Sequence, residues 1–403
     1  MQTAIFPDMR ISTVLNAAFP GLIENDHKLM VGGVGSDIWH SPEEPSDELW
    51  MITDRGPNGR ARVDGKERRI FPIPSYTPLI IHARTDGSTV SVLQVIPITG
   101  QSGRPVTGLP NLEKHNETIY DYSAERALPF NPSGLDTEGL VRGPSGEFWL
   151  ADEYAPSLLR VGADGKVNKR FIPEGLKLSG ADYPTVDALP GIFGQRADNR
   201  GFESIALSGD GRTLFLATQS ALSNTGKEDD ALRNTRILAF DIASERPTAE
   251  YVYRLDPVAE FDSSVKNQPE EMRISALVWA GSDSLLVLER TDRVAKLFRV
   301  NLGTATNVLG SAWDDSDKRP SLEMIRDPGS VGIQVLSKSL VVDFSTLGKV
   351  PDKLEGVAIL DPSTLLVAND NDFDVGKFDK NGNNVGEGLR SQILKISLAT
   401  PLP

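Results

Sequence analysis

Acidic residues recur at both ends of a short repeated pattern in this sequence. The segment DTEGLVRGPSGEFWLADE, residues 136–153, carries Glu138 before one apolar run and Asp152 after the next. Carboxylates can move protons at a reacting group, and they can bind a hard cation such as Ca²⁺. Either role requires that the fold bring several of them together, so the elements that hold them must be identified.

The pattern occurs five times, as an apolar run, a turn of Gly, Pro, Asp or Ser, and a second apolar run. Alignment of the apolar runs gives one equivalent polar position before the first run, occupied by Ser36, Glu138, Glu203, Ser275 and Glu355. The residues at the ends of the second runs are Asp54, Asp152, Thr218, Glu289 and Asn369. They follow 14 or 15 residues later in four copies and 18 residues later in the first. Each copy is typical of a β-hairpin.

Further strand-like runs follow most of these hairpins, for example TPLIIHART and TVSVLQVIP after the first. Four antiparallel strands per repeat, with variable insertions, are typical of a β-propeller. We therefore predict an all-β fold, a single β-propeller domain over residues 1–403 with four-stranded antiparallel blades and long loop insertions. The blade-like units are 31–98, 136–173, 201–256, 272–310 and 354–398. The insertions are 99–135, 174–200 and 311–353.

Five blades are counted, and a sixth has room in 99–135 or 311–353. The last unit offers only SQILKISL as a third strand, so we expect the N-terminus to supply its outer strand, at ISTVL, residues 11–15. Such pairing would close the ring and cover the sheet edge. EKHNETIYDYSAERAL, residues 113–128, is the best helical candidate. A two-sheet sandwich or several small β domains remain as alternative architectures.

Composition excludes several functions. The net charge of −14 disfavours nucleic acid and anionic membranes as partners, and no apolar run is long enough for membrane insertion. The absence of cysteine excludes thiolate catalysis and disulfides, and the four histidines show no zinc-site spacing. The opening MQTAIFPDMR lacks the features of a signal peptide, and neither G-x-S-x-G nor a Walker loop occurs.

A metal site follows from the propeller prediction. The first strand of each blade lines the central channel, so Glu138, Glu203 and Glu355 would converge there. Unpaired carboxylates in one place are costly unless a cation binds between them. Oxygen ligands suit Ca²⁺ best, with Mg²⁺ as the alternative, and the further ligands expected are Asp152, Asn369 and Asp370. The competing interpretation is that each glutamate caps backbone amides or pairs with an arginine.

Other side chains could act on a substrate at this site. Asp54 and Glu153 end second strands and could serve as acid or base at the channel mouth, although each could equally be a structural hydrogen-bond acceptor. Arg55 and Arg60, in the basic segment DRGPNGRARVDGKERR, could bind a phosphate or carboxylate, unless this segment is a solvated loop. His115 is a further substrate-binding candidate.

These motifs resemble a known family. DTEGLVRGPSGEFWLADEYAPSLLRVGADGKVNKRFIP, with ITDRGPN upstream, is similar to the phytase-like family, also called esterase-like activity of phytase. The matching positions are Asp136, Glu138 and Gly139; Asp152, Glu153 and Pro156; Asp164 and Gly165; and Asp54, Arg55 and Gly56. The resemblance extends over roughly 30–398. It implies a propeller, frequent export to the extracellular space or periplasm, and a hydrolase.

Two functions remain open at this stage. The first is a Ca²⁺-dependent propeller hydrolase, a monomer acting on phosphoesters or simple esters at the channel mouth. The second is a non-catalytic propeller that binds a small anionic ligand or a protein partner. The first requires Arg55 or Arg60 to lie within ligand reach of the carboxylates.

Overall fold

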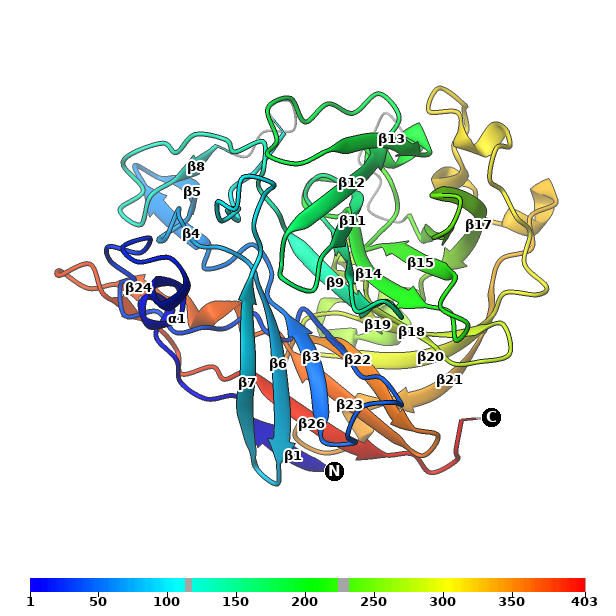
Figure 1. Cartoon of the computed structure of the whole chain (residues 1–403). Helices are drawn as coiled ribbons and strands as arrows, with labels where there is room; N and C mark the ends of the chain where they lie inside the picture. Colours follow the sequence, from blue (N-terminus) through cyan, green and yellow to red (C-terminus); the bar gives the residue numbers. More distant parts are fainter. Residues whose placement is uncertain (113–117, 224–231, 403) are drawn as a thin grey trace.

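Five blades, each with four antiparallel strands, form the body of the computed structural model, which describes residues 1–112, 118–223 and 232–402 (Figure 1). The outer strands of the first and fifth blades also pair in parallel, so these two blades form one eight-stranded sheet. From the innermost strand outward, the first blade contains β2 (Asp37–Trp39), β3 (Glu48–Ile52), β6 (Leu79–Asp86) and β7 (Thr89–Pro97). The second contains β9 (Thr137–Arg142), β10 (Phe148–Asp152), β11 (Ser157–Val161) and β12 (Val167–Pro173), with β13 (Thr185–Leu189) added in parallel outside.

The remaining blades follow the same order. The third contains β14 (Phe202–Leu207), β15 (Thr213–Thr218), β16 (Asn234–Asp241) and β17 (Arg246–Arg254). The fourth contains β18 (Arg273–Trp279), β19 (Ser284–Arg290), β20 (Ala295–Asn301) and β21 (Ser337–Asp343). The fifth contains β22 (Leu354–Asp361), β23 (Thr364–Asn369), β26 (Gln392–Ser397) and β1 (Gln2–Ile5).

The innermost strands form a closed ring. Strands β2, β9, β14, β18 and β22 each contact the inner strands of both neighbouring blades, and β22 meets β2. The all-β propeller is therefore confirmed. Within the described ranges there is no sixth four-stranded sheet, because 311–353 supplies β21 to the fourth blade, and in 99–135 only β8 (Ile119–Tyr120) is a strand.

The N-terminus closes the ring, but not with the predicted strand. Residues Gln2–Ile5 pair antiparallel with β26, and Ile5 also pairs in parallel with Thr89 of the first blade. Residues 11–15 instead begin helix α1 (Ile11–Ala18). Ile11 and Leu15, four residues apart, are both fully buried on one face of this helix. The four-residue spacing of Ile11 and Leu15 therefore matches one face of a helix.

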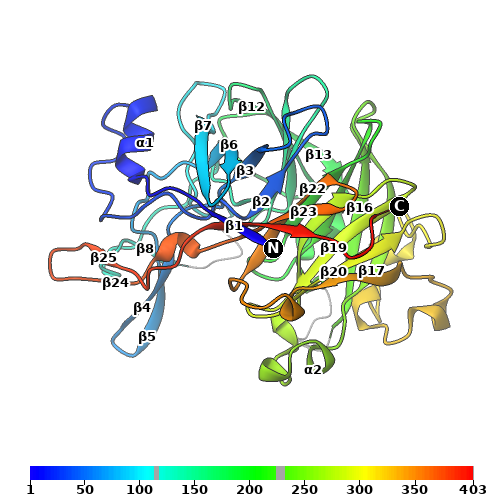
Figure 2. The ribbon, with the colours of Figure 1, turned by 90° about the horizontal axis from the view of Figure 1, so that it is seen from below.

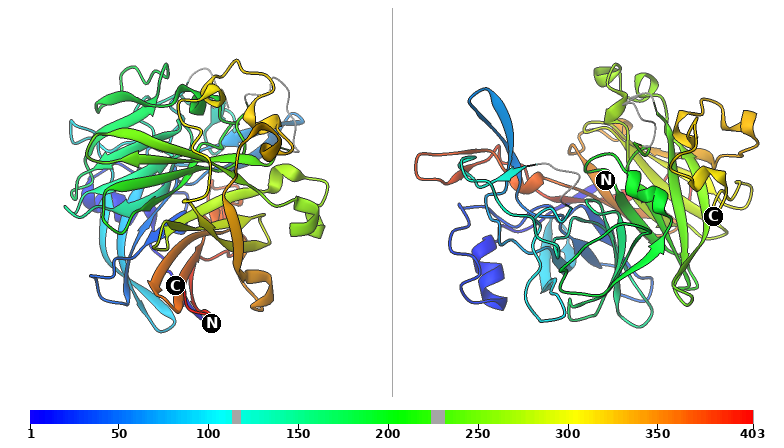
Figure 3. Two further views of the ribbon diagram at one scale, coloured as in Figure 1. Left: turned by 90° about the vertical axis from the view of Figure 1, so that its right-hand side faces the viewer. Right: turned by 90° about the horizontal axis from the view of Figure 1, so that it is seen from above.

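The helix predicted at 113–128 is wrong in its described part. Residues 113–117 lie outside the described residues, whereas Ile119–Tyr120 forms β8, which pairs with β5 (Lys66–Ile70). Strands β4 (Gly59–Val63), β5 and β8 make a small sheet, and β24 (Lys377–Phe378) pairs with β25 (Asn384–Val385). Both hairpins project from the body on the side of the molecule that carries α1, with the β24–β25 hairpin between α1 and the β4–β5 hairpin (Figures 2 and 3).

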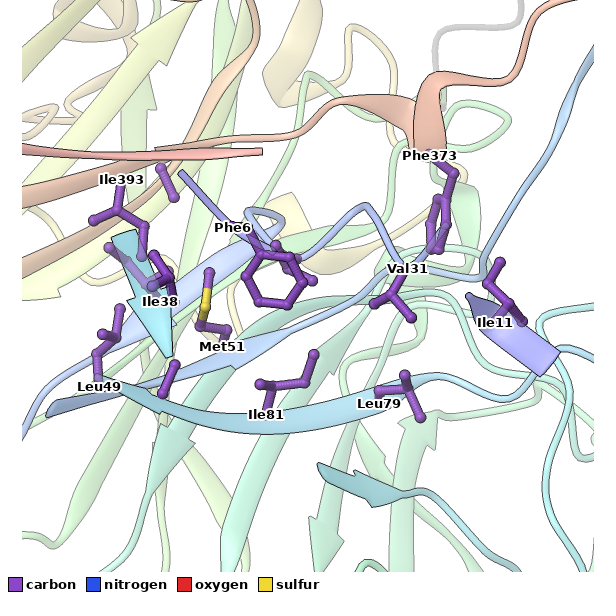
Figure 4. Close-up of a cluster of buried hydrophobic side chains, with 14 of the residues drawn as sticks. Phe6, Ile11, Val31, Ile38, Leu49, Met51, Leu79, Ile81, Phe373 and Ile393 are labelled. Atoms are coloured by element: carbon purple, nitrogen blue, oxygen red, sulfur yellow. The ribbon is translucent and has the colours of Figure 1, made fainter. Parts of the chain in front are cut away.

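Each pair of neighbouring blades encloses one apolar cluster. In β3, Leu49 and Met51 face the fifth blade, whereas Trp50 and Ile52 face the second. Side chains alternate along a strand, so a strand covered on both faces is apolar throughout. Figure 4 shows Leu49, Met51 and Ile393 packed in the cluster between the first and fifth blades, with Phe373 at its far end. This packing holds the inner strands at fixed positions around the channel.

The remaining helical elements are short and lie in the connections between strands. They are α2 (Val258–Phe261) and the 3₁₀ turns Gly191–Gln195, Ser263–Val265, Pro269–Glu271, Ala312–Asp314, Leu322–Met324, Pro328–Val331, Phe344–Thr346 and Asp372–Asp374. Among the described residues, none of the helices has the length and apolar character needed to cross a membrane.

Candidate functional site

The Glu-Gly pairs lie where neighbouring inner strands approach most closely. A Cβ atom on Gly139 would lie 2.9 Å from the backbone nitrogen of Ile205 in the next blade, and one on Gly356 would lie 2.9 Å from that of Ile38. Real Cβ atoms essentially never come so close to backbone. The glycines therefore allow the ring to close, and the preceding glutamates are brought to one end of the channel.

A cavity of about 590 Å³ opens at that end. Its lining includes most of the predicted site residues: Asp54, Arg55, Arg60, Glu138, Glu153, Glu203, Glu355 and Asp370. Eight further charged side chains that the site prediction did not include line the same cavity: Arg69, Asp136, Asp198, Arg200, Arg273, Arg290, Lys353 and Asp372. The three inner-strand glutamates therefore face one space, as their equivalent positions predict.

Three carboxylates form a tight group within this cavity. Single oxygens of Asp136, Glu138 and Glu153 all lie within 4.8 Å of one another. Asp136 and Glu153 are buried and Glu138 is half-buried. Among the described residues, Oδ2 of Asp136 is buried without a hydrogen-bond partner, although the Nε atom of Arg55 is 3.6 Å away. This is the donor set that a hard cation prefers.

Burial and mutual repulsion disfavour the charged forms of these groups. Burial raises the pKa of Glu138 well above its ordinary value, and the charges of Glu203, Asp136 and Glu153 raise it further. The pKa of Glu153 is likewise raised well above its ordinary value by burial and then by Glu203. A cation bound between them would remove much of this cost.

The other acids of the predicted ring have different partners. Glu355 forms an ion pair with Arg290, and Asp370 accepts a hydrogen bond from Nζ of Lys353 at 3.0 Å. Glu203 has a buried Oε2 without a hydrogen-bond partner among the described residues. Glu138, Glu203 and Glu355 thus share a cavity, but only Glu138 belongs to the tight group.

Two predicted ligands, Asp152 and Asn369, lie outside the cavity lining. Asp152 is fully buried and pairs with Arg170 at 2.8 Å, because alternation along the strand end turns it away from the side that Glu153 faces. Asn369 accepts a hydrogen bond from the backbone nitrogen of Gln392 at 2.8 Å and donates to backbone carbonyls. Both side chains are committed to structural bonds, which does not support a role as ligands.

The acid and substrate-binding candidates are placed as follows. Asp54 is buried, accepts a hydrogen bond from the backbone nitrogen of Gly56 at 2.8 Å, and has its pKa raised well above the ordinary value, mainly by burial. Arg55 is within reach of the carboxylates, whereas the Arg60 side chain is 62% exposed and pairs with Glu67. His115 lies outside the described residues.

Asp136 is the site residue that sequence reasoning missed most plainly. It belongs to the D-x-E-G motif, yet only Glu138 was assigned to the site. In extended chain, residues two apart point to the same side, so the D-x-E spacing is a signal that both carboxylates face one space. Arg200 and Arg273 had no comparable signal, because they come from segments far apart in sequence.

The channel has a second, less charged mouth. A cavity of about 690 Å³ lies at the opposite ends of the inner strands, where Trp39, Arg142, Leu207, Trp279 and Ile359 contribute to its lining. No group of three clustered carboxylates occurs there in the described part of the chain. The carboxylate cavity is therefore the better candidate for chemistry.

Comparison with known proteins gives a family match over most of the chain. The family model described as "Phytase-like: Esterase-like activity of phytase" matches residues 30–373. A curated relative from Arthroderma benhamiae, named "Uncharacterized secreted protein", is 27% identical over 337 residues. This alignment covers 71% of this chain and 63% of the relative, so the chain spans less than two thirds of that relative's length.

Solved structures show only loose likeness. A luciferin-regenerating enzyme matches with a TM-score of 0.36 and 12% identity, covering 92% of this chain and 94% of that one. The PQQ-bound aldose sugar dehydrogenase from Streptomyces coelicolor matches with a TM-score of 0.35 and 11% identity, covering 93% and 97%. At these TM-scores the likeness carries no argument about this chain.

Proposed function

The chain belongs to the phytase-like family, and from that premise we propose that it is a hydrolase that cleaves ester or phosphoester bonds at the carboxylate cavity with a bound Ca²⁺. The observation that carries the proposal is the group of Asp136, Glu138 and Glu153, whose oxygens lie within 4.8 Å of one another. Packing three carboxylates this closely inside a cavity is costly for a protein that has no cation to place among them.

The residues fit such a cation. All three donors are carboxylate oxygens, and Oδ2 of Asp136 is buried with no hydrogen-bond partner among the described residues. Oxygen-only sites suit Ca²⁺ and Mg²⁺, and the flexible coordination of Ca²⁺ makes it the first choice. When bound, the cation would polarise the carbonyl or phosphoryl oxygen of the substrate.

Neighbouring side chains would hold the three acids in place. Nε2 of Gln219 donates a hydrogen bond to Oε1 of Glu153 at 2.9 Å, which fixes the orientation of that carboxylate. The backbone nitrogen of Arg55 donates to Oδ1 of Asp136 at 3.3 Å, while Oδ2 lies 3.6 Å from Nε of Arg55 and accepts no hydrogen bond from the described residues, so Oδ2 is the atom that would bind the cation. Such outer contacts set the geometry of the groups that bind.

Asp54 is the proton carrier that we propose. It lies on the same cavity outside the tight group, and burial together with the charges of Asp370 and Asp136 raises its pKa well above the ordinary value. A carboxyl group with a raised pKa retains a proton closer to neutral pH and can donate it to a leaving alkoxide. Glu153, the other candidate for this role, is assigned to the cation instead.

We also propose that the protein is exported. The Arthroderma benhamiae relative is named a secreted protein, and extracellular fluids supply calcium at concentrations that fill weak sites. The expectations of a monomer and of no nucleic-acid partner stay predictions.

The test is hydrolysis after metal removal. The protein is stripped with EDTA, dialysed, and assayed on p-nitrophenyl phosphate and p-nitrophenyl acetate with Ca²⁺ or Mg²⁺ added back. We expect turnover of at least one of these esters only with added cation. Because p-nitrophenolate leaves without needing a proton, Asp54→Asn is assayed on alkyl esters, glycerol phosphate and ethyl acetate, where it should lower kcat by roughly 10²–10⁴-fold, as for loss of a general acid. Asp86→Asn, at an exposed turn of the same blade, is the matched control and should keep full activity.

Two outcomes would count against the proposal. Turnover that survives EDTA unchanged would remove the cation from the reaction. No turnover of either ester with either cation, in protein that binds Ca²⁺, would favour a propeller that binds an anionic ligand or a partner without catalysis.

A further inference from the structure

Arg200 differs from the other cationic side chains that line the carboxylate cavity. Each of the others has a partner: Arg55 with Asp136, Arg60 with Glu67, Arg69 with Asn58, Arg273 with Glu271 and Asp292, Arg290 with Glu355, and Lys353 with Asp370 and Asp372. Among the described residues, the guanidinium of Arg200 makes no hydrogen bond or ion pair; only its backbone nitrogen is bonded, to the carbonyl of Ala197. Its side chain therefore lines the cavity with N–H donors that no described residue uses.

Arg273 places a second guanidinium nearby. Glu271 at 3.1 Å and Asp292 at 2.9 Å hold it from behind. The two arginines are close enough that the charge of Arg273 adds to burial in lowering the pKa of Arg200. Two positive charges in one cavity, one of them unpaired among the described residues, create a local positive potential that favours binding of an anion.

Arg200 and Arg273 line the same cavity as the carboxylate group. The charges of Glu153 and Glu203 both act on Arg200, and both carboxylates line the same cavity. Neither carboxylate lies within 4.0 Å of the Arg200 guanidinium, so the arginine and the proposed cation site are separate positions on the same cavity. A ligand that carried negative charge on one side and a reacting ester oxygen on the other would span these two positions.

We propose that Arg200, supported by Arg273, is an anion-binding subsite of the carboxylate cavity and the residue that makes this site prefer an anionic ester to a neutral one. The preference for an anionic substrate rests on the proposed function. Anion binding at Arg200 does not depend on catalysis and can be tested without turnover. A planar guanidinium recognises phosphate or carboxylate oxygens through two parallel hydrogen bonds. Arg55 and Arg60, the arginines predicted from sequence, are already engaged with acids.

The first experiment measures binding. Methylphosphonate, which mimics a phosphate monoester but has no ester bond to cleave, is titrated calorimetrically into the calcium-loaded protein. We expect binding that Arg200→Gln weakens by roughly ten- to a hundredfold, the effect of losing hydrogen bonds to a charged group. Arg200→Lys keeps the positive charge but loses the planar guanidinium that makes two parallel hydrogen bonds. Its affinity for methylphosphonate should lie between those of the wild type and Arg200→Gln. Arg246→Gln, which removes an exposed arginine from the outer strand of the same blade, is the matched control and should bind as the wild type does.

The second experiment compares esters. The ratio of kcat/KM for p-nitrophenyl phosphate to that for p-nitrophenyl acetate should fall by the same factor in Arg200→Gln and stay constant in Arg246→Gln. Unchanged methylphosphonate affinity in a folded Arg200→Gln protein would overturn the subsite, whatever the catalytic result. Methylphosphonate binding that depends on Arg200, in a wild type that hydrolyses neither ester, would keep the subsite and refute only the hydrolase.

Discussion

The effect of Glu138→Gln on thermal stability should change sign when calcium is added. The substitution keeps the shape of the side chain and removes one of three carboxylates whose oxygens lie within 4.8 Å. Without calcium the variant should melt at a higher temperature than the wild type, because the charges of Asp136, Glu153 and Glu203 disfavour an ionised Glu138. With saturating calcium the wild type should melt higher, since it alone retains the full set of ligands.

The pH dependence follows from the direction of the pKa shift. Unfolded Glu138 titrates near its ordinary value of 4.5, and burial followed by the neighbouring charges raises its pKa in the folded protein well above this value. The folded state therefore holds the proton more tightly than the unfolded state, so calcium-free stability falls as the pH rises from about 4.5 through the folded pKa. Calcium competes with that proton, and its affinity should rise over the same range. Glu138→Gln should flatten both dependences.

The size of the calcium effect can be estimated. A ligand at one hundred times its dissociation constant stabilises the folded state by about 2.7 kcal/mol. An unfolding entropy of about 2.1 cal/mol/K per residue, over 403 residues, converts this to a rise of about 3 °C in Tm. Most of that rise should be lost in Glu138→Gln.

The assay is differential scanning calorimetry at several pH values, after EDTA treatment and after calcium is restored. Glu174→Gln, an exposed glutamate of the second blade, is the matched control and should respond to calcium as the wild type does. Equal calcium responses in Glu138→Gln and the wild type would refute the assignment of Glu138 as a ligand. A calcium-free variant less stable than the wild type would refute the claim that this carboxylate is uncompensated.

Two further predictions concern the elements that hold the site. Arg170→Leu leaves the fully buried Asp152 without its ion-pair partner and should cost about 3–5 kcal/mol in urea unfolding; a cost below about 1 kcal/mol would contradict the assigned pairing. Gly139→Ala brings a Cβ within 2.9 Å of the backbone nitrogen of Ile205 and should lower stability by about 1–3 kcal/mol. Gly194→Ala, where a Cβ meets nothing within 4 Å, is the control for it; equal effects at both glycines would show that close approach is not the reason for the motif.

The inner hairpins of the blades were predictable because both of their faces are buried. In β10, Phe148 and Leu150 pack toward the first blade, whereas Trp149 and Ala151 pack toward the third, so the strand is a continuous apolar run. Outer strands carry a weaker signal. β21 (Ser337–Asp343) is largely exposed and polar, and it follows the third strand of its blade only after a long insertion. Pattern reasoning assigned it to the insertion for that reason.

The closing strand illustrates a different limit. Gln2–Ile5 is too short to be recognised from periodicity, and its identity as a strand depends on β26 at the other end of the chain. The apolar spacing at 11–15 fits a strand or a helix over so short a range, and tertiary packing of Ile11 and Leu15 decided for the helix. The need to close the ring predicted that an N-terminal segment would supply the outer strand of the fifth blade, but it did not indicate which residues form that strand.

The candidate site was predictable in position and less so in its pairings. Equivalent positions in the repeat are enough to bring Glu138, Glu203 and Glu355 to one cavity. Which acid pairs with which base depends on side chains from different blades, such as Arg290 with Glu355. Such contacts have no spacing in the sequence that would indicate them.

The distribution of bases around the cavity argues that the uncompensated acids are there for a ligand. On the side of the fourth and fifth blades, Arg290 neutralises Glu355 and Lys353 neutralises Asp370. Toward the second blade, Asp136, Glu138 and Glu153 are grouped; Arg55 pairs with Asp136, whereas among the described residues Arg200 forms no ion pair with any of the three. If only charge balance mattered, Arg200 could form an ion pair with these acids, as Arg290 and Lys353 do with theirs. Because Arg200 is held apart from Asp136, Glu138 and Glu153, a cation could bind at the acids and an anion at the arginine. A metal-bound anionic ester requires this arrangement.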